Sequence, residues 1–379
     1  MTKHVKVCDL FVYCFISMFS LSYAFYHSSI HIPDSIQTFF TVGCCVVFLM
    51  YLIRRKYKYK ELILYMLLFG IGVSSYLITR MSIFLLIILA SIMIGKDDIS
   101  KVMVIVLIVN ILNVLITGVC SIIGFIPMNI MEVYKSGAVV QKNSFGFNHP
   151  NQLGQALGII NLLQSYFCVA QEKKISKVLN VFTIIISYFI SGSRSALIIC
   201  VLYFIFVLFY EKERISFRLE RKLYKNSWFF MILIIFLAVG CPYLMDKVYG
   251  WNKTVLWKVN GLLGSRFSYA SAVMSYYPVS LFGNLFNFSY LNTLYGHSVL
   301  DNGYINLLYN FGLTAFIIYI VCSIKTVRFF SAKHEGKVAF LLLLLNLWGA
   351  IENIVFLPTI NISVFFLGSW IQHYRKEIM

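Results

Sequence analysis

Four short polar segments interrupt a largely apolar sequence, and they hold the side chains best suited to chemistry. They are residues 143–152 (NSFGFNHPNQ), 191–195 (SGSRS), 264–266 (GSR) and 296–304 (GHSVLDNGY). Arginine offers forked donors that match phosphate oxygens, histidine and carboxylates accept protons, and Asn or Gln amides bond to hydroxyl groups. These residue types favour a substrate that carries both phosphate and sugar groups.

Two arginines stand next to apolar segments, where a charge is costly unless it faces a cavity or a partner. Arg194 lies among Gly and Ser residues at the predicted start of a helix, which makes a natural seat for an anion. An arginine that snorkels to the membrane interface is an equal alternative. Arg80 permits the same two interpretations, with snorkelling favoured by its surroundings, and stays a candidate phosphate ligand.

The pair His297 and Asp301 is the best candidate for acid–base chemistry. The two residues are four positions apart, so they share a face if the following helix begins early. A neutral imidazole beside a carboxylate is a plausible general base. The alternative is a hydrogen-bonded loop histidine, which is the commoner case for an isolated His.

The other histidines indicate binding or structure rather than catalysis. His149 is flanked by Asn148 and Asn151, which suits a structural role or a contact with sugar hydroxyls. His27 and His31 have a metal-like spacing, but no acidic or cysteine ligand accompanies them. We therefore expect no metal site.

An acidic residue, Glu352, falls within an apolar segment and is followed by Asn353. An ionisable side chain at membrane depth is a functional candidate by default. It could equally pair with a buried donor for packing, and the sequence leaves both interpretations open.

The elements that position these residues are membrane helices. Of the 379 residues, 60% are apolar and only 12% are charged, with a mean hydropathy of +0.80. A soluble domain would carry about 25% charged residues, so the chain has far more apolar side chain than one core can hide. Continuous apolar runs rather than alternating ones exclude an outer-membrane barrel. The predicted fold class is an all-α integral membrane protein with about 12 transmembrane helices.

The apolar runs define the expected helices and two long outer loops. We predict helices at 9–26, 36–53, 61–78, 82–96, 102–126, 152–170, 178–190, 196–210, 228–244, 303–324, 338–357 and 359–372. The whole chain, 1–379, is expected to form a single polytopic membrane domain. Its two long outer loops are 126–151 and the large extracytoplasmic loop 245–302, between helices nine and ten. Within the second, residues 266–277 predict a helix capped by Gly264–Ser265 and ended by Pro278.

The formal charge of +17 is distributed as expected for a membrane protein rather than for a protein that binds nucleic acid. Most Lys and Arg residues lie in short loops on one predicted side, which marks those loops and both termini as cytoplasmic. Anionic lipid headgroups explain such a distribution. All four polar segments then fall on the outer face. The sequence has no phosphate loop or Gly-rich fingerprint, so no cofactor is expected and the energy must come with the substrate.

In order along the chain, NSFGFNHPNQLG (143–154), SGSRSAL (191–197), GSR (264–266) and HSVLDNGYINLLYNFGL (297–313) resemble the O-antigen polymerase and ligase superfamily. The nearest likeness is to Wzy-type polymerases of capsular or exopolysaccharide repeat units. The resemblance covers about residues 140 to 313, and the first 130 residues resemble the family only in hydropathy.

The resemblance implies a GT-C-like, metal-independent glycosyltransferase in the bacterial cytoplasmic (inner) membrane. Its substrate would be an undecaprenyl-diphosphate-linked oligosaccharide, and undecaprenyl diphosphate would be released. Arg194 and Arg266 match arginines expected to hold the donor diphosphate, and His297 matches a histidine near the acceptor hydroxyl. Many polymerases show an Asp-Asn pair, as at Asp301–Asn302 here, without a His, so Asp301 is the competing base.

Partners and alternatives follow from the same interpretation. Membrane lipids, a chain-length regulator and a flippase are candidate partners, while nucleic acid is not. Asn148, His149, Asn151 and Asn302 are the candidate sugar contacts. Two other functions remain open: ligase-type transfer of glycan to another acceptor, and a lipid-linked oligosaccharide flippase or transporter. Transporters tend to show repeated halves, and no internal repeat is visible here.

Overall fold

The structure, a computed structural model, describes residues 7–55, 57, 59–135, 138–169, 174–210, 213–245, 247–285 and 300–371. In this part of the chain the elements are α1 (Val7–Ser22), α2 (Asp34–Arg54), α3 (Tyr59–Thr79), α4 (Ile83–Met93), η1 (Lys96–Asp98), α5 (Ile99–Ile123), β1 (Ile130–Lys135), β2 (Ala138–Asn143), α6 (Pro150–Val169), α7 (Lys174–Ser191), α8 (Arg194–Tyr210), α9 (Glu213–Ile235), η2 (Phe236–Gly240), α10 (Cys241–Leu244), α11 (Gly250–Leu262), α12 (Arg266–Tyr276), α14 (Gly303–Asn306), η3 (Leu307–Phe311), α15 (Gly312–Ala332), α16 (Gly336–Gly349) and α17 (Ser363–Phe366). The protein is therefore mostly helical, as predicted.

Several of these helices are long and apolar enough to lie in a membrane. Five helical stretches of the described chain are long and apolar enough to cross a bilayer: Asp34–Arg54, Glu61–Thr79, Lys96–Ile123, Ser216–Leu244 and Gly303–Ala332. Shorter apolar helices accompany them at Val7–Ser22, Ile83–Met93, Ile175–Ser191, Arg194–Tyr210 and Gly336–Gly349. Many of their outward side chains are large and exposed, such as Phe39 at 67% and Leu67 at 61%. Such surfaces suit contact with lipid.

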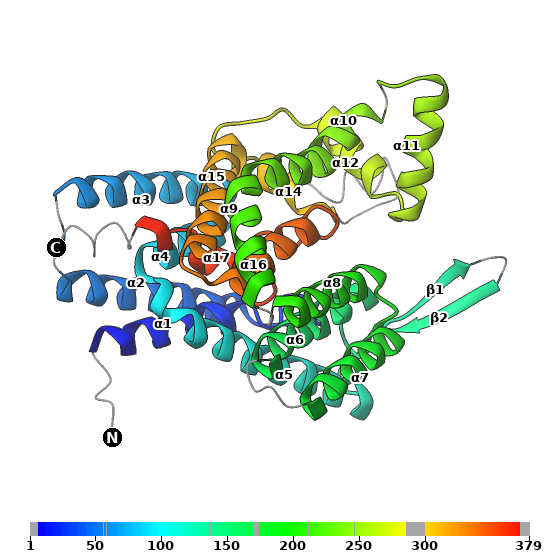
Figure 1. Ribbon diagram of the computed structural model, residues 1–379, viewed down its shortest axis with the longest axis horizontal. Helices are drawn as coiled ribbons and strands as arrows, with labels where there is room; N and C mark the ends of the chain where they lie inside the picture. The colour runs from blue at the N-terminus through cyan, green and yellow to red at the C-terminus, as the bar shows by residue number, and fades with distance from the viewer. Residues whose placement is uncertain are drawn as a thin grey trace.

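The helices pack in sets of neighbours (Figure 1). Helix α1 packs on α2 and α5, while α6, α7 and α8 pack on one another. Helix α15 packs against α9 and α16, and α16 also contacts α8. Helix α4, which packs on α1, α2, α3 and α17, is almost wholly enclosed, because ten of its eleven residues are buried. A helix that is apolar on every side belongs inside a protein or a membrane, and here other helices surround it.

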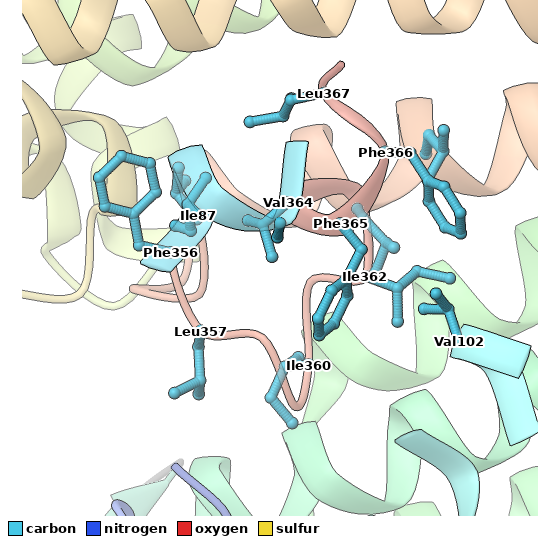
Figure 2. Packing of buried hydrophobic residues seen from close by; sticks show 14 of the residues in the cluster. Ile87, Val102, Phe356, Leu357, Ile360, Ile362, Val364, Phe365, Phe366 and Leu367 are labelled. Atoms are coloured by element: carbon cyan, nitrogen blue, oxygen red, sulfur yellow. The ribbon is translucent and has the colours of Figure 1, made fainter. Parts of the chain in front are cut away.

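The C-terminal part of this core is irregular rather than helical. Phe356 stacks on Phe84 of α4 at a centroid distance of 5.5 Å and lies beside Ile87, and the short helix α17 adds Val364, Phe365 and Phe366 to the same buried cluster (Figure 2). The amide of Asn361 donates to the carbonyl of Val355 at 2.8 Å and accepts from the backbone N–H of Ser363 at 3.2 Å. Irregular backbone at membrane depth requires such internal partners.

Two predictions of helix bounds are wrong here. The eleventh helix was expected over 338–357 but ends at Gly349, and the expected helix 359–372 is broken, because among the described residues only Ser363–Phe366 and residues 369–371 are helical. The apolar run continues through both, so hydropathy cannot reveal the break. As a consequence Glu352 lies in a buried turn after α16, not within a helix.

The two segments that were predicted as long outer loops, 126–151 and 245–302, also contain secondary structure that was not predicted. Residues of the expected loop 126–151 form an antiparallel hairpin, β1–β2, with Ile130 opposite Asn143, and this hairpin projects from the edge of the molecule (Figure 1). In the second long loop α12 runs over Arg266–Tyr276, which confirms the predicted helix. Its cap comes from Asn260 of α11, whose side-chain oxygen accepts the N–H of Phe267 at 2.9 Å, rather than from Ser265.

Candidate functional site

The candidate site is centred on Arg266, the first residue of α12. Its Nη2 donates to Oε1 of Glu352 at 2.8 Å, and its Nη1 donates to the carbonyl of Leu263 at 3.2 Å. Its Nε lies 3.5 Å from Oδ2 of Asp301. The arginine side chain is 14% exposed, so one guanidinium is held between a buried carboxylate and a more open one.

Glu352 is the anchor of this arrangement because its side chain is only 1% exposed. Its Oε1 also accepts from Oγ of Ser195 at 2.8 Å, and its Oε2 accepts from Nε2 of Gln155 at 3.1 Å. A buried carboxylate is tolerated only when it is paired and hydrogen-bonded. The segments that carry α6, α8, α12 and the turn after α16 therefore meet at this one side chain.

Asp301 lies at the open side of the site, with its side chain 39% exposed. The following helix begins at Gly303, so Asp301 precedes it and the expected shared helical face with His297 does not form at Asp301. The side-chain oxygen of Asn302 accepts the N–H groups of Tyr304 and Ile305, both at 3.1 Å, which is a strong N-cap. This cap fixes the backbone next to Asp301 and turns the carboxylate towards Arg266.

His149 belongs to the same charged neighbourhood. Burial lowers the pKa of His149 from its usual 6.5, the Asp301 carboxylate opposes that shift, and Arg266 and Lys142 add to it. The imidazole Nδ1 accepts the backbone N–H of Asn151 at 3.0 Å, so a neutral ring carries its proton on Nε2. Lys142 of β2 donates to the carbonyl of Gly192 at 3.0 Å, which ties the hairpin to the turn before α8.

Three helices begin at this cluster. Helix α6 starts at Pro150 directly after His149, α8 starts at Arg194 directly before Ser195, and α12 starts at Arg266 itself. The first N–H groups of a helix lack internal partners, and the helix dipole adds positive potential there. Close approach of α6 and α8 depends on Gly154, because a Cβ there would lie 2.3 Å from Cβ of Ser193. The converging helix starts favour an anion.

The site also contains hydrogen-bonding capacity that is not used. Among the described residues, Oε1 of Gln155 and Nε of Arg266 are buried without a hydrogen-bond partner. Each unsatisfied buried atom costs about 1–3 kcal/mol. One of these atoms accepts and the other donates, as expected for a place that a polar ligand completes.

A groove of about 550 Å³ lies next to this cluster. Its walls come from the α1–α2 connection, the start of α2, the α3–α4 turn, the start of α14 with η3, and the turn after α16: Tyr23, Tyr26, His27, Asp34, Gln37, Thr38, Thr41, Val42, Tyr76, Arg80, Met81, Ser82, Ile83, Asn306, Asn310, Phe311, Asn353, Phe356 and Leu357. Asn353 follows Glu352 directly in the chain. The groove is thus contiguous in sequence with the cluster.

The predicted site residues divide between these places. Arg266, Asp301 and His149 belong to the Arg266 cluster, as just described. Arg194 is exposed, and among the described residues it makes no hydrogen bond or ion pair, although its neighbour Ser195 contacts Glu352. Arg80 lies in the wall of the groove with a left-handed backbone (φ 58°).

Of the remaining predicted residues, Asn148 and Asn302 make hydrogen bonds within the protein, and His297 is not among the residues that the structure describes. Asn148 is exposed and accepts from Oγ of Ser29 at 3.2 Å. Asn302 is 1% exposed, and its amide is fully engaged because it also donates to the carbonyl of Ala238 at 2.6 Å. Asn302 thus acts as a helix cap, and its contact with a sugar stays a prediction. His297 lies outside the described residues.

Sequence reasoning missed Gln155 and could not choose a role for Glu352. An amide one turn into a largely apolar helix is a weak signal that could have indicated Gln155.

In the described part of the chain, no group of three or more His, Cys, Asp or Glu side chains gathers as a metal site. The chain matches no protein-family profile, no curated protein and no solved structure.

Proposed function

We propose that this protein is a polysaccharide polymerase of the membrane. It would join undecaprenyl-diphosphate-linked oligosaccharide repeat units at the outer face of a bacterial cytoplasmic membrane and release undecaprenyl diphosphate. About twelve crossings in a GT-C-like arrangement belong to the same proposal. The five long apolar helices and their shorter neighbours support the membrane part of it.

The observation that carries the proposal is the meeting of a buried arginine with three helix starts. Lys142, Arg194 and Arg266 bring three positive charges to this region against the carboxylates of Asp301 and Glu352. Helix N-termini add further positive potential without added bulk. A diphosphate leaving group needs this kind of fixed, preorganised positive environment.

The reaction follows from these groups. The acceptor hydroxyl attacks the anomeric carbon of the donor sugar, and the bond from that carbon to the diphosphate oxygen breaks. Arg266 and Arg194 stabilise the charge that develops on the diphosphate. The proton of the hydroxyl passes to a base, for which Asp301 and His297 are the two candidates. Of these two, only Asp301 lies in the part of the chain that the structure describes, where its Oδ2 is 3.5 Å from Nε of Arg266.

Glu352 has a positioning role in this scheme. It holds Nη2 of Arg266 at 2.8 Å and is itself held by Ser195 and Gln155. A guanidinium fixed in this way faces the substrate without a loss of side-chain entropy at the moment of reaction. A buried ion pair is by itself poor evidence for stability. In this scheme the Glu352–Arg266 pair serves instead to orient the arginine.

The test is conversion of a defined lipid-linked repeat unit by the purified protein. Wild-type protein should produce a ladder of products that differ by one repeat unit. Arg194→Ala should lower the rate about 100-fold, the cost of one donor at a developing charge, while exposed Arg218→Ala serves as the matched control. Normal ladders from Arg194→Ala would refute the role of this arginine. A wild-type product one transfer long would instead indicate ligase-type chemistry.

A further inference from the structure

The groove beside the Arg266 cluster has the size of a small-ligand site. Its volume of about 550 Å³ lies within the 300–1,000 Å³ that such sites occupy. It is lined from both ends of the chain, by α1–α4 on one side and by the α14–η3 and post-α16 segments on the other. None of its described lining residues was part of the Arg266 cluster.

The C-terminal wall of the groove is a ladder of amides. Asn306 donates to Oδ1 of Asn353 at 3.0 Å, and Asn310 donates to Oδ1 of Asn306 at 3.4 Å. Hydroxyl groups face them from the other wall, where Oγ of Ser82 lies 3.3 Å from Oγ1 of Thr41. Linked amides and hydroxyls both donate and accept, which is the pattern that a polyhydroxyl ligand requires.

His27 supplies an unused polar atom in the same groove. Its Nε2 is buried and, among the described residues, has no hydrogen-bond partner. Burial lowers the pKa of His27 from 6.5 to about 4, so the ring is neutral at neutral pH. A buried, neutral and unpartnered ring nitrogen is costly unless a ligand completes it.

The charges in the groove decide against a diphosphate. Arg80 and Asp34 are its described arginine and aspartate, and they cancel. A diphosphate needs an excess of positive charge. Lys142, Arg194 and Arg266 outnumber the carboxylates of Asp301 and Glu352 in the region of Arg266, whereas the described lining of the groove has no such excess. Exposed aromatic side chains, Tyr26 at 61% and Tyr76 at 39%, instead offer ring faces to a sugar. We therefore assign Arg80 to saccharide binding rather than to the diphosphate.

We propose that this groove binds the repeat-unit oligosaccharide of the acceptor substrate, with the amide ladder and His27 as its hydrogen-bonding partners. This inference rests on the proposed function. Because Asn353 directly follows Glu352, a saccharide held by the ladder ends beside the Arg266 cluster, where its terminal hydroxyl meets the donor. The donor diphosphate and the acceptor sugar thus occupy two adjoining sites of different charge.

The test is a steric block at an exposed position of the wall. Thr38→Trp on α2 places an indole in the groove, and Ile36→Trp adds the same ring to the same helix at an exposed residue outside the lining. The probe is the single-repeat oligosaccharide, released by mild acid from the lipid-linked intermediate of the host strain and labelled at its reducing end. Its binding to purified protein is measured by fluorescence anisotropy.

Wild type and Ile36→Trp should bind the probe equally, and Thr38→Trp should bind it at least tenfold more weakly. Thr38→Trp should also raise the KM for the acceptor with little change in kcat. Equal binding by Thr38→Trp and wild type, or no binding by wild type, would overturn the groove assignment. Product ladders from the wild type test the proposed function separately, so the two ideas can fail independently.

Discussion

Among the described residues, two glutamates are buried, one at each end of the helix α8 region, and their surroundings differ. Glu352 is paired with Arg266, which is 14% exposed and always charged. Glu220 on α9 accepts from the hydroxyl of Tyr210 and lies 2.9 Å from Nδ1 of His334, a side chain that is 74% exposed. The Glu352–Arg266 pair is thus largely shielded from solvent, whereas the Glu220–His334 pair has an exposed histidine.

The neighbouring atoms differ as well. Around Glu352, among the described residues, Oε1 of Gln155 and Nε of Arg266 are buried without a hydrogen-bond partner, although this Nε is ion-paired with Asp301 at 3.5 Å. Around Glu220 the hydroxyl of Tyr210 also accepts the N–H of Gly336 at 3.2 Å, so this group joins α8, α9 and the α15–α16 connection. A carboxylate whose contacts only join helices stabilises the fold. A carboxylate whose neighbours have unused donors and acceptors is prepared for a ligand.

The largest effect is expected from Glu352→Leu. It leaves the guanidinium of Arg266 buried without its main counter-charge, which costs about 3–5 kcal/mol, and the thermal midpoint in detergent should fall accordingly. Replacing both residues, Arg266→Met with Glu352→Leu, should recover most of the midpoint. The product ladder should be absent from both variants. An active double variant would remove this pair from the proposed chemistry.

A smaller effect is expected from the matched change Glu220→Leu. Its partners keep access to solvent through His334, so the loss should be about 1–2 kcal/mol, as for one buried hydrogen-bonding group. The rate of ladder formation per folded molecule should stay within twofold of wild type. Thermal unfolding and the elongation assay, run on the same preparation, measure both. A loss of activity as large as that of Glu352→Leu would erase the distinction between the two carboxylates.

The smallest effect concerns pH. Burial holds the pKa of His149 below 6.5, so the unfolded chain takes up a proton first as the pH falls. The stability that this histidine contributes is present above pH 6.5 and is lost as the pH falls towards its folded-state pKa. His149→Gln should therefore flatten the decline of the thermal midpoint below pH 6.5. The exposed His31→Gln is the control, and an equal flattening by both would contradict the prediction.

Composition and hydropathy were enough to predict a helical membrane protein. The chain has too few charged residues and too many continuous apolar runs for a soluble fold to bury its apolar side chains. The prediction of a helical membrane protein therefore follows from solvation alone. The helix after GSR was also predictable, because Pro278 forbids its continuation. The charge rule predicted that the polar segments lie on one face. Three of them do come together, because Arg266 pairs with both Asp301 and Glu352, and Ser195 donates to Glu352.

The position of Glu352 was beyond sequence reasoning. Local hydropathy continues unchanged through the end of α16, and the turn that replaces the expected helix is stabilised by Asn361 and by packing on α4. The strands of the 126–151 segment were missed for a related reason, since a short hairpin at the edge of a helical protein has no buried face to pattern its sequence.

The sequence by itself determined the solvent in which this chain folds, the kinds of chemical group it has available and the order in which they occur. Tertiary structure decided which of them meet. Arg266 faces Glu352 across 86 residues, Asn302 is used as a cap, Arg194 stays exposed, and Arg80 joins a groove built from both ends of the chain. Partner choice at such separations depends on how helices pack, and packing depends on all the side chains together.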